Sequence, residues 1–495
     1  MLYQGDIVPT SKQMDQLVDD ALENGKLTRT QLEEVFKITY PFITPDPNPL
    51  SNVKAPGAGP KESNRDSAQI SPSGDPAPVG QDGATDAISN FTGGSEHSGL
   101  AGTPGGAGGG RAPTYPLSRR CVRILQREEE TELWSLPIAY YVEDKDNEVL
   151  NDYIKKAIDV LESESCLVFK ESKSKPKSGN FLHFKIGSFC ASAVGMVSSA
   201  KRTGQVVTLM GSVGVDSKGH KSCLTPGTVL HEIAHALGFW HQQSIPVRDN
   251  YVEVLEKNVP SNYLGQFVRQ SSGGIQTDEI PYDYGSIMHY ASNVFAKRKT
   301  DLSMNPKLNL YYKSTMGQRA GLSFYDTMAL QMAYCPKCQN KLRCKNNGYT
   351  DRKECKKCHC PTGYAGKKCT LVELANQPDS LCPSGKGKDR EQKAESDWQS
   401  LEFTGKSRCI YKIKAKKKKV ELKIEELNMD CKNTCGQYLE IKIEEDKGKT
   451  GMRFCCRNSI PEKALVTKSS AAIVYYRQDL PESTHRAKIS FRAVD

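Results

Sequence analysis

Hydrophobic residues follow a helix-like or strand-like spacing in separate regions of the chain. Near the amino terminus, residues 11–38 carry apolar side chains at helical spacing, which predicts a small pair of helices. From about Trp134, the apolar runs LPIAYYV, FLHFKI and QVVTLM predict strands, and the spacing around 152–161 predicts a helix. This second region extends to about Cys335, which is long enough to bury one sizeable core.

The carboxyl-terminal region, residues 382–495, has short runs in which apolar and polar residues alternate. KVELKIEEL, YLEIKIEE and AAIVYYRQ are the clearest of these runs. A period of two is typical of strands with one buried face. Several such runs separated by polar segments predict an all-β sandwich.

Between the first two regions the hydrophobic pattern disappears. Residues 45–113 consist mostly of Gly, Pro, Ser and Ala, and cannot bury enough apolar surface to fold. We therefore predict a disordered linker over 45–120. It contains a glycosylation sequon at Asn90 and ends at Arg119 and Arg120. This dibasic pair is either a protease-sensitive processing site or two solvated charges.

The composition favours a soluble extracellular protein. At 495 residues the chain is expected to hold about two to four domains. The net charge of +10 is spread over residues of both signs without a recognition module, which argues against nucleic-acid binding. The 17 cysteines predict a disulfide framework, an oxidising compartment and hence secretion. No signal peptide is visible, so we expect it to be missing from the sequence, and no apolar run could span a bilayer.

The stretch VLHEIAHALGFWHQQ, which begins at Val229, carries the strongest chemical signal. Just before it, Thr225 can cap a helix and Pro226 suits the first helical turn. On such a helix His231 and His235 stand four residues apart. Both imidazoles then project from one face, where together they can hold one metal ion.

Gly238 is expected to end this helix in a left-handed conformation, after which His241 can swing back as a third ligand. Three imidazoles with one open position are typical of a catalytic zinc site, whereas a structural site is closed by four protein ligands. Zinc activates water and polarises a carbonyl, and Glu232 is placed to take the proton and deliver it to the leaving amine. The pattern predicts peptide hydrolysis with one Zn²⁺ per chain. A surface helix with unrelated histidines is the alternative, which the five fixed positions of HExxHxxGxxH argue against.

A second motif, SIMHY at residues 286–290, lies downstream. Taken alone, Met288 would be an ordinary core residue. Together with the histidine motif, the segment resembles the Met-turn of metzincin proteases, and the two motifs resemble the astacin family of zinc endopeptidases. The resemblance implies an α+β catalytic domain with a mixed sheet and an active-site helix. It further implies that Met288 lies beneath the metal ligands, and that Tyr290 is a zinc ligand that swings away to stabilise the oxyanion.

Other segments are similar to successive parts of an astacin catalytic domain, namely LWSLPIAYYV, SCLVF, PYDYGSIMHY, GQRAGLS and AYC. The segment LYQGD near the amino terminus is similar to the family's propeptide motif. There the aspartate occupies the open zinc position, so Asp6 is expected to keep a zymogen inactive; an ordinary Gly-Asp turn is the alternative. The resemblance also implies two disulfides, Cys166 with Cys335 and Cys190 with Cys223.

Two cysteine-rich modules are expected after the catalytic domain. The first resembles an EGF-like module with six cysteines, Cys338, Cys344, Cys355, Cys358, Cys360 and Cys369. Zinc binding by the same six cysteines is the alternative. The second fits a divergent CUB domain, a β-sandwich used for protein contacts: Cys382, Cys409, Cys431, Cys435, Cys455 and Cys456. This order resembles the nematode astacins. The predicted parts are a propeptide (1–44), the linker (45–120), the protease domain (121–335), the EGF-like module (336–370) and the CUB-like domain (382–495).

Three features depart from the pattern or remain unassigned by it. Cys121 is left without a partner, and is either a free or intermolecular thiol or a latch that binds the zinc. Gln242 stands where astacins usually have a glutamate that receives the mature amino terminus, which puts the link between processing and activity in doubt. The basic run Lys416–Lys419 either binds polyanions or protects the edge of a strand.

Together these features predict a secreted, zinc-dependent endopeptidase made as a zymogen. Its expected substrates are extracellular proteins of the matrix or cuticle type, and its EGF and CUB modules are possible sites for protein partners. The alternative is a catalytically weak adhesion or binding protein that uses the same two modules. Gln242 is the feature that favours this alternative.

Overall fold

The structure of the protein is a computed structural model, and the residues that it describes belong to one compact unit. It describes residues 6–7, 131–197, 204–214, 222–270, 280–374, 382, 390–479 and 484–495. Several predictions concern residues outside these ranges, namely the amino-terminal helices, the linker, Asn90, Arg119, Arg120 and Cys121.

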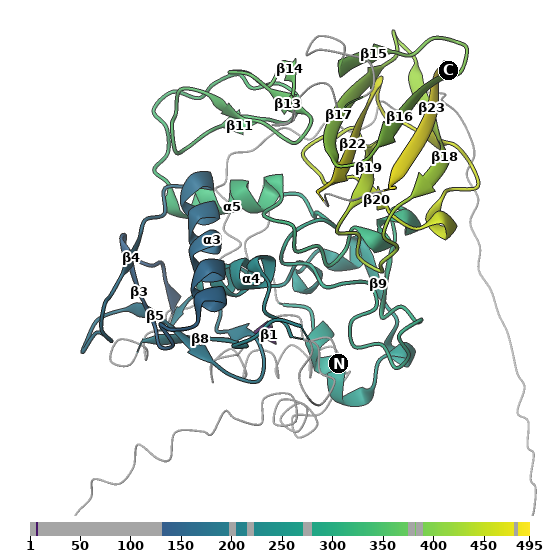
Figure 1. The fold of residues 1–495 in the computed structure, drawn as a ribbon. Helices are drawn as coiled ribbons and strands as arrows, with labels where there is room; N and C mark the ends of the chain where they lie inside the picture. The colour runs from purple at the N-terminus through teal and green to yellow at the C-terminus, as the bar shows by residue number, and fades with distance from the viewer. Residues whose placement is uncertain are drawn as a thin grey trace, which may run out of the picture. The chain divides into compact units, whose positions relative to one another are not determined.

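A six-stranded mixed sheet forms the first part of the catalytic region, in the order β1-β6-β8-β5-β3-β4 (Figure 1). The runs predicted as strands form β3, β5 and β8, which are parallel to one another, whereas β6 is antiparallel to β8. The expected mixed sheet is therefore confirmed. The bounds are β1 Asp6–Ile7, β3 Ile138–Val142, β4 Phe169–Glu171, β5 Phe181–Ile186, β6 Ala191–Ser192 and β8 Gln205–Leu209.

Two helices, α3 (Glu148–Glu164) and α4 (Pro226–Ala236), pack together beside this sheet (Figure 1). Helix α3 is longer than the predicted 152–161 because Asn147 caps it, accepting a hydrogen bond from the Leu150 amide at 3.1 Å. Its apolar stripe is buried in one cluster with residues of α4 and the sheet. Burial of this shared face is what stabilises the layer, since an isolated helix of this length is marginal in water.

The rest of the catalytic region is built mainly from turns and short 3₁₀ helices, which no periodicity predicted. A third α-helix, α5 (Phe324–Tyr334), closes the region, and Ser323 and Asp326 form a capping box at its start. The short strands here pair as β2 (Thr131–Glu132) with β7 (Met196–Val197) and β9 (Val252–Val254) with β10 (Met304–Pro306). The 3₁₀ helices are η2 Gln242–Ser244, η3 Arg248–Asn250, η4 Glu256–Asn258, η5 Ser261–Phe267, η6 Leu310–Ser314 and, further along the chain, η9 Arg457–Ser459.

The cysteine-rich module that follows has two small antiparallel pairs. These are β11 (Tyr349–Thr350) with β12 (Cys358–His359), and β13 (Tyr364–Ala365) with β14 (Leu371–Val372). Disulfides supply the stabilisation that so small a core cannot, because a short segment buries little apolar area. They join Cys338 to Cys355, Cys344 to Cys358 and Cys360 to Cys369.

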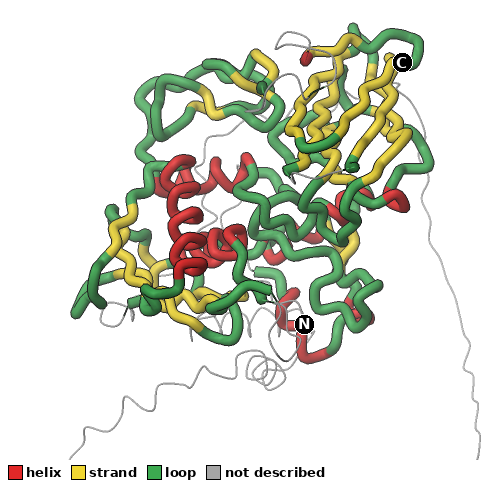
Figure 2. The backbone as a smooth tube through the Cα atoms, viewed as in Figure 1, coloured by secondary structure: helices red, strands yellow, loops and turns green. Residues whose placement is uncertain are grey.

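The carboxyl-terminal region contains two β-sheets, which confirms the predicted all-β architecture (Figure 2). One sheet has the order β15-β17-β22-β19-β20 and the other β16-β23-β18-β21. The strands are β15 Glu391–Lys393, β16 Gln399–Thr404, β17 Ser407–Lys414, β18 Lys419–Asn428, β19 Tyr438–Lys442, β20 Met452–Phe454, β21 Leu465–Val466, β22 Ala471–Gln478 and β23 Arg486–Val494. Its disulfides are Cys382–Cys409, Cys431–Cys456 and Cys435–Cys455.

The basic run Lys416–Lys419 does not lie along a strand as expected. It forms the turn between β17 and β18, and only Lys419 belongs to a strand. Lys417 has a φ of 58°, in the left-handed region that tight turns require. The run is exposed, so its charges lie in a turn between strands of two different sheets rather than alternating between two sheet faces.

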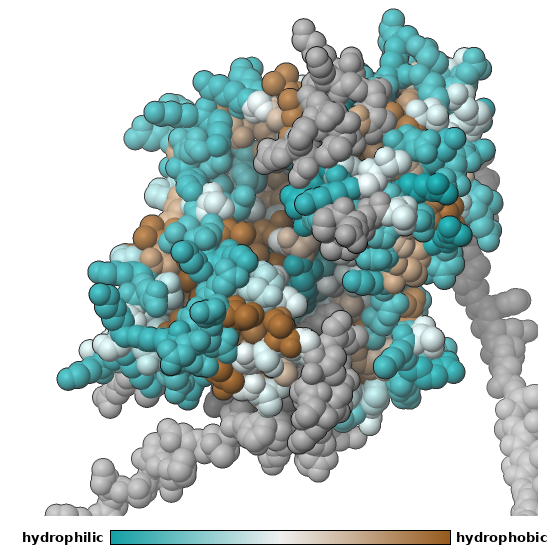
Figure 3. Space-filling model, in the orientation of Figure 1, coloured by the Kyte–Doolittle hydropathy of each residue, from teal (hydrophilic) through white to brown (hydrophobic). Residues whose placement is uncertain are grey.

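The face of the molecule in Figure 3 is mainly hydrophilic, with hydrophobic residues gathered in small patches. Scattered patches of this size are normal on a soluble surface. Among the residues that the structure describes, no helix is both long and apolar enough to cross a lipid bilayer.

Candidate metal centre

Helix α4 begins and ends as its sequence predicts. The Thr225 side chain accepts a hydrogen bond from the Thr228 amide at 3.1 Å, and Pro226 occupies the first turn. After Ala236 the chain passes through Gly238, whose φ of 106° is one that L side chains rarely adopt. The Gly238 amide donates to the His235 carbonyl at 2.8 Å, which closes the helix end and turns the chain back toward the helix.

This turn brings three histidines together. His231, His235 and His241 are buried, and the ligand atoms they can offer lie within 4.8 Å of one another. The Nε2 atoms of His235 and His241 are 3.1 Å apart. The three histidines are therefore positioned to bind one metal ion.

Hydrogen bonds fix the tautomer of the two helical histidines. The Nδ1 atom of His231 lies 2.9 Å from the Ile287 carbonyl oxygen, and that of His235 lies 2.7 Å from the Phe239 carbonyl oxygen. Because a carbonyl oxygen only accepts, each Nδ1 must carry the hydrogen. Each Nε2 then keeps a lone pair for a metal, and the backbone holds the ring orientation.

Burial keeps these imidazoles neutral. It lowers the pKa of His235 to about 3 and lowers the pKa of His231 well below its usual range, with a further contribution to His231 from the positive charge of Arg319. A metal ion requires neutral imidazole. Three buried imidazoles with converging nitrogens fit zinc, which prefers nitrogen ligands in a tetrahedral arrangement.

Glu232 lies beside the first ligand and is fully buried. It interacts electrostatically with Arg319. Burial lowers the pKa of Arg319 to about 10, and the negative charge of Glu232 acts against this lowering. Arg319 donates from Nη1 to the His289 carbonyl at 3.2 Å. Sequence reasoning gave Arg319 no role, although it lies in the quoted GQRAGLS segment.

The segment around Met288 lies directly against the histidines. Met288 is buried, and its carbonyl accepts a hydrogen bond from the Gln242 amide at 3.0 Å. The ring of Tyr290 lies with its centroid 4.3 Å from that of His241, and its hydroxyl donates to Gln266 Oε1 at 3.4 Å. The structure thus brings the SIMHY segment and the histidine motif into one site.

A buried carboxylate holds this segment from the other side. Asp326 accepts hydrogen bonds from the Ser286 hydroxyl at 2.6 Å and the Ile287 amide at 2.8 Å. Burial raises the pKa of Asp326 to about 6, against the effect of these donors. Sequence reasoning missed this residue, although the spacing of Ser323 and Asp326 before an apolar run is a signal of a capping box.

The remaining site residues are placed as follows. Cys166 is bonded to Cys335 and Cys190 to Cys223, the pairs that the resemblance implies. Strand β1, which contains Asp6, pairs in parallel with β6 at the edge of the sheet. The role of Asp6 in latency stays a prediction.

The three histidines, the SIMHY segment and the mixed sheet thus form a region with one candidate metal site. Residues 126–335 match the model of the astacin peptidase family, and residues 384–491 match the CUB domain model. The chain therefore contains an astacin domain followed by a CUB domain, and the use of one zinc ion is a property of the astacin family.

Several nematode proteins are similar over most of this chain. Zinc metalloproteinase nas-36 of Brugia malayi is 32% identical over 378 residues, which cover 74% of this chain and 60% of that protein. The nas-36 protein of Haemonchus contortus is 34% identical over 355 residues, covering 69% and 53%. Zinc metalloproteinase dpy-31 of Caenorhabditis elegans is 32% identical over 358 residues, covering 69% and 56%. The chain thus spans little more than half the length of these curated relatives.

Among solved structures, high choriolytic enzyme 1 is similar. It is a hatching enzyme zinc-protease from Oryzias latipes that is 23% identical, and the match covers 42% of this chain and 98% of that one with a TM-score of 0.35.

Proposed function

We propose that the protein is a zinc-dependent endopeptidase. The observation that carries the proposal is the convergence of three buried imidazoles, whose ligand atoms lie within 4.8 Å of one another, next to the buried carboxylate of Glu232. An open three-histidine site with an adjacent carboxylate suits hydrolysis, because a closed structural site would need a fourth protein ligand.

Each residue then has a distinct role in hydrolysis. His231, His235 and His241 would hold the zinc, which when bound supplies a Lewis acid that activates water and polarises the peptide carbonyl. Glu232 takes the proton from the attacking water and delivers it to the leaving amine. The Tyr290 hydroxyl, close to His241, donates a hydrogen bond to the oxyanion.

The proposal extends to a secreted zymogen that cleaves extracellular proteins, with matrix or cuticle proteins as the expected substrates. The eight disulfides among the described residues support an oxidising compartment. Pairing of β1 along the edge of the sheet supports an inhibitory segment that includes Asp6. Cleavage after Arg120 would release it.

Replacing Glu232 tests the catalytic assignment. The Glu232→Ala variant should lose hydrolysis of a quenched fluorescent peptide by roughly 10³-fold, because proton transfer by a positioned carboxylate is worth about that much. Its zinc content should stay at about one per chain, since the three histidines are unchanged. Glu253→Ala, on an exposed residue of β9, is the control that should keep full activity. Retained hydrolysis in the Glu232 variant would refute the assigned mechanism.

Cleavage at Arg120 offers a test that distinguishes a latent enzyme from a catalytically weak adhesion or binding protein. Activity and zinc content are measured on the same chain before and after cleavage at Arg120. Activity that appears only after cleavage, at one zinc per chain, supports a latent protease. Bound zinc without activity in either form would support a binding protein and direct attention to Gln242, which is buried beside His241.

A further inference from the structure

The CUB domain shares a hydrophobic core with the second half of the catalytic region. Tyr284, Tyr312 and Met316 of the catalytic region belong to the same cluster of buried residues as Tyr438 and Phe454 of the CUB domain. A continuous core of this kind is typical of regions that fold as one unit, whereas independent modules usually meet through a smaller and more polar interface.

A buried carboxylate joins the two regions within this contact. Asp283, which is 2% exposed, accepts two hydrogen bonds from Thr450 of the CUB domain, from its amide at 3.0 Å and from its hydroxyl at 3.0 Å. It also accepts one from the Gly285 amide at 3.1 Å. Hydrogen bonds to a buried carboxylate are stronger than neutral ones, and the carboxylate is costly to leave without donors.

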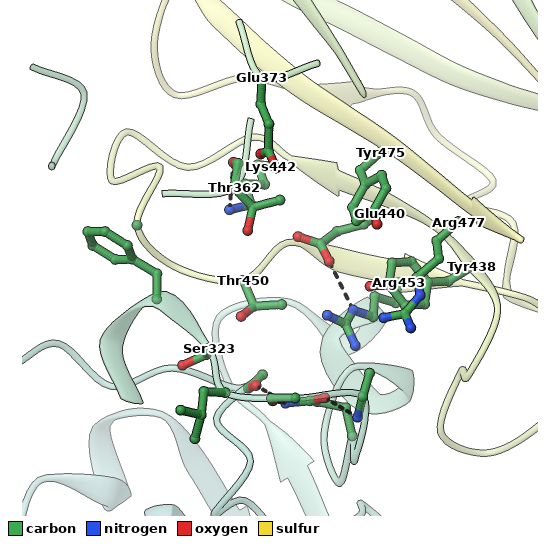
Figure 4. A pocket seen from close by; sticks show the side chains of 17 residues that line it. Ser323, Thr362, Glu373, Tyr438, Glu440, Lys442, Thr450, Arg453, Tyr475 and Arg477 are labelled. Atoms are coloured by element: carbon green, nitrogen blue, oxygen red, sulfur yellow. Dashed lines mark hydrogen bonds and ion pairs between the residues drawn. The ribbon is translucent and has the colours of Figure 1, made fainter. Parts of the chain in front are cut away.

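The backbone at Gly285 of the catalytic region lies close to the Thr450 side chain at the same point. A side chain at Gly285 would place its Cβ 2.3 Å from the Thr450 hydroxyl oxygen, so only glycine allows this approach. Thr450 lines a cavity of about 230 Å³, together with Ser323 of the catalytic region and the Glu440–Arg453 ion pair of the CUB domain (Figure 4).

The contact leads directly to the metal centre. Asp283 and Gly285 begin the turn 283–290, in which the Ser286 amide donates to the Asp283 carbonyl at 3.1 Å. Further along this turn, the Ile287 carbonyl accepts the hydrogen bond that orients His231. Thr450 is thus linked to a ligand of the proposed zinc site through one short turn of buried backbone.

We propose that Thr450 is a positioning residue for the metal centre, and that the CUB domain is therefore a structural part of the catalytic unit. By fixing Asp283, Thr450 holds the turn 283–290 so that the Ile287 carbonyl meets His231. This inference rests on the proposed metal site, but not on hydrolysis by it.

A second contact between the same two regions provides a matched control. Thr434 of the CUB domain donates from its hydroxyl to the Met316 carbonyl at 2.8 Å. This bond also crosses the interface, but it does not reach the turn 283–290. Removing it should weaken the contact between the regions without moving His231.

The experiment compares three variants of the full chain: Thr450→Val, Thr450→Ser and Thr434→Val. Valine keeps the shape of threonine and removes the hydroxyl, whereas serine keeps the hydroxyl. The zinc dissociation constant is measured by competition with a chelator, because loss of a group that orients a metal ligand typically weakens metal binding about 10-fold to 100-fold. Thermal unfolding of each variant shows which of them fold.

We expect Thr450→Val to raise the zinc dissociation constant about 10-fold. After cleavage at Arg120, it should also lower kcat on a short peptide while KM stays unchanged. Thr450→Ser and Thr434→Val should bind zinc like the natural chain. An equal loss in Thr450→Val and Thr434→Val would overturn the proposal, since it would indicate only a weakened interface. Differences in zinc binding without hydrolysis by any chain, even after cleavage at Arg120, would support this inference and refute the proposed function.

If Thr450→Val does not fold, Asp283 offers a test from the other side. In Asp283→Ala the hydrogen bonds from Thr450 and from the Gly285 amide are lost. In Asp283→Asn the amide oxygen can still accept from both backbone amides and the amide nitrogen can donate to the Thr450 hydroxyl. Asp283→Ala should raise the zinc dissociation constant at least about 10-fold and Asp283→Asn less than about threefold. Unchanged zinc binding in a folded Asp283→Ala chain would contradict the proposal.

Discussion

At the scale of single residues, the metal centre depends on the protonation of its imidazoles. Each helical histidine gives its Nδ1 hydrogen to a backbone carbonyl, so Nε2 is the atom that faces the metal position. Burial disfavours the charged form of both rings. These two histidines can therefore bind a metal ion at neutral pH without first releasing a proton.

The role of Tyr290 can be tested by removing its hydroxyl group alone. Tyr290→Phe removes the hydroxyl and keeps the ring that packs near His241. We expect kcat to fall roughly 10²-fold, as for loss of one oxyanion donor, with zinc content unchanged. Steady-state kinetics and metal analysis measure both. Tyr476→Phe is the control, because the Tyr476 hydroxyl donates to the Gly405 carbonyl at 3.2 Å within the CUB domain. An equal loss of kcat in both variants would contradict the assigned role.

At the scale of elements, the sequence predicted those parts whose structure is decided by nearby residues. Helix α4 starts at the Thr225 cap and ends before Gly238, and strands β5 and β22 coincide with the runs FLHFKI and AAIVYYRQ. The 3₁₀ helices between α4 and α5 could not be predicted, because their backbone is held by contacts with distant residues. The bond between Asp283 and Thr450 is one example of such a contact in this region, since it joins residues 167 positions apart.

Helix α4 also makes a close contact that sets its position. A Cβ on Gly227 would lie 1.9 Å from the Arg319 carbonyl oxygen, which is backbone and cannot turn aside. Alanine gains about 1 kcal/mol over glycine in a helix, whereas forced overpacking costs about 1–3 kcal/mol. We expect the steric cost to prevail, so that Gly227→Ala lowers the free energy of unfolding by about 1–2 kcal/mol, measured by denaturant titration. Gly436→Ala, where nothing lies within 4 Å, is the control, and no loss in Gly227→Ala would show that the loop carrying Arg319 can move.

At the scale of the whole molecule, the sequence predicted the kinds of region but not how they are joined. Alternation of apolar residues was enough to predict the two sheets of the CUB domain, and cysteine spacing was enough to predict a disulfide-rich module. A shared core depends on how two surfaces fit together. The periodicity of a sequence indicates which face of an element is buried, but it does not indicate which other element covers that face. The CUB domain therefore appeared as a separate binding module in the sequence and as a neighbour of the metal centre in the structure.

Stability of the whole chain should depend on pH through buried groups near this centre. Burial lowers the pKa of His289 to about 4. Its Nε2 atom lies 2.7 Å from the Tyr282 hydroxyl oxygen, and its Nδ1 atom lies 2.7 Å from the Tyr290 carbonyl oxygen. In the unfolded chain this histidine titrates near pH ~6.5, so between about pH 6.5 and 4 the unfolded state binds the extra proton. The free energy of unfolding should therefore fall by up to about 3 kcal/mol as the pH is lowered through this range.

The raised pKa of Asp326, about 6, acts in the opposite direction. Its folded form holds a proton that the unfolded form has lost, so its contribution to stability declines as the pH rises from about 4 to 6. Burial also lowers the pKa of His231 and His235, so in the zinc-free chain both add to the loss of stability at low pH, and only a comparison of variants isolates His289. In His289→Asn the histidine contribution is absent and that of Asp326 remains, so the variant should gain stability relative to the natural chain as the pH falls. Denaturant titrations of both zinc-free chains from about pH 7.5 to 4.5 measure this difference, and parallel profiles would refute the assignment to His289.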